Sequence, residues 1–137
     1  HDHYDADAVS IPGRGWVMVK ARSHEADEVV RAMRAGDFYA STGVGLTDVV
    51  VEDGRMTIDI EREPGIEYTT EFIGALRTQG DERPMARVLA STTEDPATYR
   101  FTGGELYVRA RVTSTRPHPR PYRKGDLETA WTQPVQP

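Results

Sequence analysis

The chain has 137 residues, of which 37% are hydrophobic and 28% charged, and it contains no cysteine. This composition predicts one ordinary soluble domain, or a small domain with a piece of another, and it excludes disulfides and cysteine-based zinc sites. The net charge of -5 argues against nucleic-acid binding by bulk charge, and no apolar run approaches the ~18 residues of a membrane span. We therefore expect no nucleic acid or membrane partner, and a cytoplasmic location.

The first ten residues are polar, rich in histidine and aspartate, and lack the basic and apolar segments of a signal peptide. We interpret them as a cut end from which upstream chain has been removed. They hold the densest cluster of metal-type ligands in the sequence: His1, Asp2, His3, Asp5 and Asp7. Imidazole and carboxylate groups suit zinc, manganese or iron, but the pattern alone favours a solvated polar tail over a metal site.

A strand and a helix are predicted next. The apolar run 16–21 predicts a buried strand. Ser23 is expected to cap the helix that follows, because acidic residues occupy the first turns after it. Gly36 is placed to end the helix in a left-handed conformation. These signals predict a helix over residues 24–35.

After this helix the hydrophobic period changes to two, which predicts about six strands and a small antiparallel β-sandwich. Asp53 and Gly54 separate two such segments and predict a hairpin with a type I′ turn. Val108 is expected to face the core with its alternate neighbours on a later strand. Residues 116–125 contain three prolines and five basic side chains and predict a loop, and 130–135 predict a last strand.

Few other residues suggest chemistry. Ser41, Thr42 and Gly43 form a short turn that could offer hydroxyls and backbone N–H groups to an anion, although the sequence alone favours a simple turn between two domains. His24 and His118 are expected to face solvent. Trp16 and Trp131 are expected to be packing anchors.

Several segments together resemble a known family. They are 13–21 (Gly-Arg-Gly-Trp-Val-Met-Val-Lys-Ala), 34–43 (Arg-Ala-Gly-Asp-Phe-Tyr-Ala-Ser-Thr-Gly), 106–110 and 130–135. In this order they resemble the C-terminal part of bacterial PHP-family proteins, the polymerase and histidinol phosphatase metal-dependent phosphoesterases. The resemblance covers most of the chain. One departure is Val44, where the family pattern has proline.

The resemblance implies an α+β architecture: residues 1–43 as the last strand–helix unit of a distorted β/α barrel, and 44–137 as an accessory β-sandwich. It implies that zinc, manganese or iron in the parent protein activates water against a phosphorylated small molecule. His1 would be a metal ligand with His3 beside it, and Ser41, Thr42 and Gly43 would contact substrate. The family's early His-x-His motif and middle carboxylates have no counterpart here, so we expect no tight metal binding by this chain alone.

Three interpretations follow. The chain is an inactive fragment of a phosphoesterase, or a β-sandwich binding module, or a structural domain. The apolar strand and capped helix favour the first, because an independent sandwich does not need them. If upstream chain covers them in the parent, residues 1–36 should be less stable here than the remainder, or be held by self-association.

Overall fold

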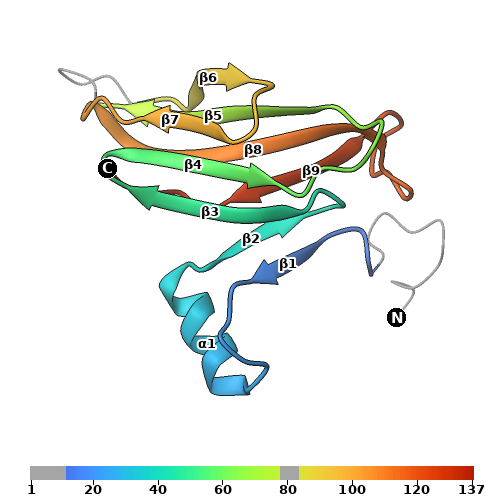
Figure 1. Ribbon diagram of the computed structural model, residues 1–137. Helices are drawn as coiled ribbons and strands as arrows, with labels where there is room; N and C mark the ends of the chain where they lie inside the picture. Colours follow the sequence, from blue (N-terminus) through green and yellow to red (C-terminus); the bar gives the residue numbers. More distant parts are fainter. Residues whose placement is uncertain (1–11, 78–83) are drawn as a thin grey trace.

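The computed structural model describes residues 12–77 and 84–137, which form two antiparallel sheets packed face to face (Figure 1). The larger sheet has six strands in the order β1-β2-β9-β8-β5-β6, and the smaller has three in the order β3-β4-β7. The elements are β1 (Trp16–Val19), α1 (Ala26–Ala35), β2 (Phe38–Ser41), β3 (Leu46–Glu52), β4 (Arg55–Ile60), β5 (Tyr68–Leu76), β6 (Arg87–Thr92), β7 (Ala97–Arg100), β8 (Glu105–Pro117) and β9 (Leu127–Thr132).

The core lies between the two sheets. Alternate residues of β4 point into it, and Met56 and Ile58 are fully buried there. The larger sheet contributes Phe72 from β5 and Val108 from β8, both also fully buried. This inward and outward alternation is what a strand with one covered face requires, and it confirms the predicted orientation of Val108.

The hairpin between β3 and β4 confirms the prediction made from Asp53 and Gly54. Glu52 pairs with Arg55, and the two residues between them have φ values of 48° and 71°. Positive φ at both central positions defines the type I′ turn, whose twist matches that of the flanking strands. The sequence signal was reliable because the turn depends only on these two residues.

The expected α+β architecture with a β/α-barrel unit is wrong. A barrel unit needs parallel strands joined by the helix, whereas β1 and β2 are antiparallel neighbours, with Trp16 opposite Ser41 and Val19 opposite Phe38. The protein is mostly β, and α1 is an excursion inside a β1–β2 hairpin (Figure 1). The backbone N–H of Lys20 donates to the carbonyl of Asp37 at 2.8 Å and closes that hairpin.

The helix boundaries are partly as predicted. Gly36 follows α1 with φ of 79°, and its backbone N–H donates to the carbonyls of Ala32 and Met33, as expected for a glycine that ends a helix. At the other end Glu25, not Ser23, occupies the N-cap position. Ser23 Oγ instead accepts a hydrogen bond from the Glu25 N–H at 3.3 Å.

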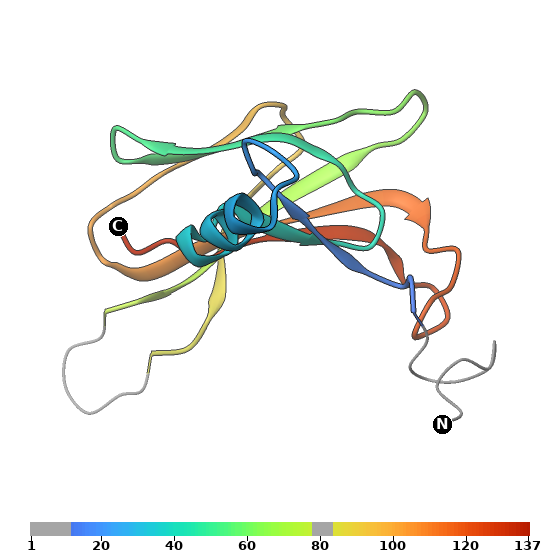
Figure 2. The same cartoon turned by 90° about the horizontal axis from the view of Figure 1, so that it is seen from below.

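The prediction of a buried strand over 16–21 is also wrong. β1 is the end strand of the larger sheet, and Trp16, Val17 and Met18 are each about half exposed. The smaller sheet covers the middle of the larger one and leaves this end open (Figures 1 and 2). The apolar composition of this segment therefore predicted a strand correctly but predicted its burial wrongly. No helix in the described part of the chain is long and apolar enough to cross a membrane.

Candidate functional site

The turn after β2 carries the residues predicted to contact substrate, and its polar groups are engaged within the protein. Ser41 is buried; its Oγ donates to the Val44 carbonyl at 2.7 Å and accepts from the Gly43 N–H at 2.9 Å. Thr42 Oγ1 accepts from the backbone N–H of Thr129 at 2.9 Å, and the Thr42 N–H donates to the Thr129 carbonyl at 2.9 Å. These bonds join the turn to β9, and substrate binding by it stays a prediction.

Gly43 sits where its backbone approaches the side chain of Glu128. Its φ is 154°, and a Cβ built there would overlap the carboxyl end of Glu128. Glu128 is largely buried and lies 3.8 Å from an Arg116 guanidinium nitrogen, so it has little room to move. A glycine is therefore required at the third position of the Ser-Thr-Gly turn.

We expect Gly43→Ala to destabilise the protein by about 1–3 kcal/mol, because Glu128 must shift away from Arg116. Gly104→Ala is the matched control: a Cβ there would make only an ordinary contact, at 3.6 Å from Thr102 Oγ1. Urea denaturation of the two variants measures the difference. Equal midpoints for both would show that Glu128 relaxes without cost.

The predicted metal ligands His1 and His3 lie outside the described residues. Among residues 12–77 and 84–137, no three His, Asp or Glu side chains come together in a way that could hold a metal ion. His24 is exposed, as predicted. The metal assignment of His1 and His3 stays a prediction.

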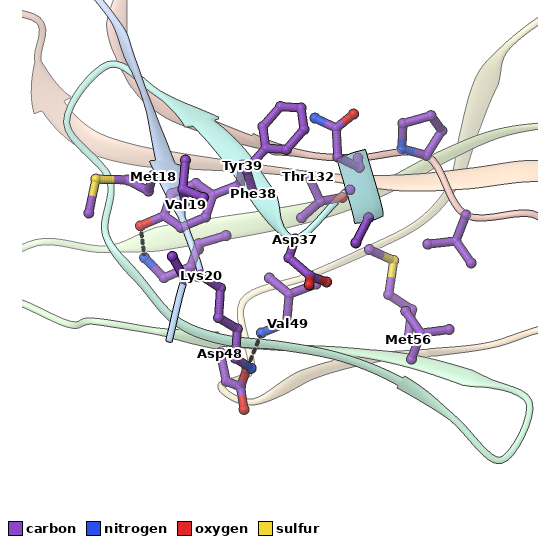
Figure 3. A pocket seen from close by; sticks show the side chains of 18 of the residues that line it. Met18, Val19, Lys20, Asp37, Phe38, Tyr39, Asp48, Val49, Met56 and Thr132 are labelled. Atoms are coloured by element: carbon purple, nitrogen blue, oxygen red, sulfur yellow. Dashed lines mark hydrogen bonds and ion pairs between the residues drawn. The ribbon is translucent and has the colours of Figure 1, made fainter. Parts of the chain in front are cut away.

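A cleft of about 920 Å³ opens between the β1–α1–β2 unit and β3 (Figure 3). Its walls are mixed, with Met18 and Tyr39 on one side and Val49 on the other. Lys20 spans its edge and meets Asp48 at 2.6 Å. The hydrogen bonds from Lys20 and from the Val49 N–H hold the pKa of Asp48 below its usual value. This ion pair ties β1 to the smaller sheet.

Apolar side chains are also exposed on the same unit. Besides the three exposed residues of β1, they include Val30 and Met33 of α1, which are also about half exposed. α1 projects from the body formed by the two sheets (Figure 1). We call these five residues the β1–α1 surface: Trp16, Val17, Met18, Val30 and Met33. Exposed apolar residues concentrated on one unit indicate an interaction surface.

The loop that joins β8 to β9 lies beside the start of β1 (Figure 2). A second, smaller hollow lies between this loop and the start of β1. His118 in that loop is only 8% exposed, so the prediction that it faces solvent is wrong. Its ring joins two segments that are far apart in the sequence: Nε2 lies 2.8 Å from the Arg14 carbonyl, and Nδ1 accepts from the Arg120 N–H at 3.0 Å. Because His118 lies between two prolines in a polar segment, the sequence around it does not predict that it is buried.

Glu105 is a further buried ionisable group whose burial the sequence did not indicate. It is 1% exposed, and its carboxylate accepts hydrogen bonds from the Tyr99 hydroxyl at 2.8 Å and the Thr102 N–H at 2.9 Å. Burial favours the neutral acid, but these hydrogen bonds outweigh it and lower the pKa of Glu105 to about 2. For Tyr99, burial and the bond to Glu105 raise the pKa to about 12. This pair holds a loop in place.

Comparison with known proteins adds no assignment: no family model, no curated protein and no solved structure matches this chain.

Proposed function

We propose that this chain is the C-terminal, non-catalytic part of a metal-dependent phosphoesterase, and that the β1–α1 surface is its contact with the metal-bearing part. The catalytic part would use a divalent metal to activate water against a phosphoester. The chain described here would contribute a two-sheet domain fixed beside that site.

The observation that carries this proposal is the exposure of the β1–α1 surface. Large apolar side chains at an open sheet end and on a projecting helix are costly to leave in water, at roughly 25 cal/mol per Å². The same residues, 13–21 and 34–36, carry much of the resemblance to PHP-family phosphoesterases. The exposed apolar side chains and the segments that resemble the family therefore lie on the same unit, β1 and α1.

Hydrogen exchange tests the contact. In this chain alone, we expect the amides of Val17, Val19 and Met33 to exchange faster than those of Ile58 and Val108, because only the latter lie in the core. In the whole product of the gene, including any residues encoded before His1, protection of the first group should rise. Manganese-dependent hydrolysis of p-nitrophenyl phosphate should accompany it.

Two matched methionine variants distinguish loss of the contact at the β1–α1 surface from a general effect of adding a charge. Met33→Asp should reduce the gained protection, because it places a charge in the contact, whereas Met85→Asp should not, since Met85 is exposed away from β1 and α1. Uniform protection across both groups in a monomer of this chain, without phosphoesterase activity of the whole product, would contradict the proposal. The two-sheet domain would then be an independent binding or structural module.

A further inference from the structure

The hollow beside the β8–β9 loop has the features of a binding groove. Its volume is about 560 Å³, and it lies between the segment before β1 and residues 118–127. We call it the basic groove and define it by five of its lining residues: Arg14, Thr42, His118, Arg120 and Tyr122. Trp131 of β9 adds an aromatic wall. Figure 2 shows the loop beside the start of β1.

His118 fixes the shape of this groove. Because its Nδ1 accepts from the Arg120 N–H, the proton lies on Nε2, which donates to the Arg14 carbonyl. The backbone N–H of His118 donates to the Asp126 carbonyl at 2.9 Å, and Arg14 Nε donates to the Arg120 carbonyl at 3.0 Å. These four bonds hold both arginine backbones in place before any ligand arrives, which lowers the entropic cost of binding.

The groove and its rim are strongly cationic, although the whole chain has a net charge of -5. In the described part of the chain, Arg120, Arg123 and Lys124 form no ion pair with a carboxylate. Among the described residues that line the groove, the one carboxylate is that of Asp126, which accepts a hydrogen bond from the Arg123 N–H at 2.7 Å. Positive charge collected in this way attracts anions.

Tyr122 contacts two of the cationic side chains through its aromatic ring. The guanidinium carbons of Arg14 and Arg123 each lie 5.9 Å from the centre of its ring, within the range of a cation–π interaction. The ring is 63% exposed, so this arrangement is not explained by packing of Tyr122 in the core. The contacts with the Tyr122 ring hold the guanidinium groups of Arg14 and Arg123 beside the groove.

We propose that the basic groove binds a ligand through a phosphate or sulfate group held by Arg120. Guanidinium groups match the geometry of tetrahedral oxyanions and form charge-assisted hydrogen bonds with them. The ligand is either a phosphorylated small molecule or a sulfated or phosphorylated polymer, which share this chemistry. The inference stands apart from the proposed phosphoesterase function, since it uses neither the metal nor the β1–α1 surface.

Titration of the whole chain at constant ionic strength, followed by amide and indole NMR shifts, tests the groove. The probes are inorganic phosphate, pyrophosphate and a heparin oligosaccharide, with chloride as the background anion. We expect saturable shifts confined to the groove, including the Thr42 amide and the Trp131 indole. Stronger binding of pyrophosphate indicates a small phosphorylated ligand, and stronger binding of heparin with length indicates a polymer.

Charge-matched variants give the deciding comparison. Arg120→Gln should weaken binding by about tenfold or more, the loss expected for a hydrogen bond between charged groups. Arg100→Gln removes an exposed arginine of β7 and should leave binding unchanged. Equal affinities for the two variants, or no saturable shift with any of the three probes, would overturn the inference.

Discussion

Val108→Asp should abolish folding. Val108 has no exposed surface, and its backbone N–H and carbonyl each bond with Val135 at 2.8 Å while its strand pairs with Gly74 of β5. The substitution places a carboxylate between the two sheets without a partner, at a cost of more than about 4 kcal/mol. That cost approaches the whole stability of a domain of this size, about 5–15 kcal/mol. Circular dichroism at 25 °C should show loss of the β signal.

Val88→Asp is the control for this variant. Val88 lies on β6, the other end strand of the larger sheet, and is 47% exposed. A carboxylate there stays hydrated, so the melting temperature should change by only a few degrees. A Val108→Asp protein that melts within a few degrees of the parent would mean that the β8 face is inverted, with Tyr107 and Arg109 inside.

Glu105 should make the protein sensitive to acid. Its pKa falls from an ordinary value of 4.5 to about 2 on folding, so the folded state binds the proton less tightly than the unfolded state. The resulting stability is present in full above pH 4.5 and is lost as the pH falls from 4.5 towards 2. This contribution of Glu105 to the free energy of unfolding is about 3 kcal/mol. Urea denaturation at pH 7, 4.5 and 3 measures it.

Glu105→Gln isolates that contribution from the other carboxylates. The amide keeps one acceptor oxygen but turns an NH₂ group towards the Thr102 N–H, so the variant should lose about 1–3 kcal/mol at pH 7. It should also lose less stability than the parent between pH 4.5 and 3. Glu94→Gln, at an exposed position, should follow the parent at every pH. An identical acid slope in Glu105→Gln and the parent would show that Glu105 is not the group responsible.

The two proposed surfaces lie on the same end of the larger sheet and draw on different physics. The β1–α1 surface is apolar and would lose water on contact with a protein partner. The basic groove is cationic and would bind an oxyanion, so raising the salt concentration should weaken binding there and leave the apolar contact largely unaffected. A salt series therefore distinguishes them without any substitution.

The features that depend only on neighbouring residues could be predicted from the sequence. The type I′ turn at Asp53 and Gly54, the helix end at Gly36 and the inward face of Val108 were all predicted correctly. Each follows from backbone preference or from alternation over a few positions, which the chain carries locally.

The features that depend on contacts between residues far apart in the chain could not be predicted from the sequence. A strand, a helix and a strand in succession describe a barrel unit and a hairpin with a helical insertion equally well, and only the antiparallel pairing of β1 with β2 separates them. Trp16 is apolar yet half exposed because the smaller sheet ends before reaching β1. His118 is polar yet buried because residue 14 supplies its partner from 104 positions away. A residue is buried when other segments of the chain pack over it, and the local sequence does not specify which segments do so.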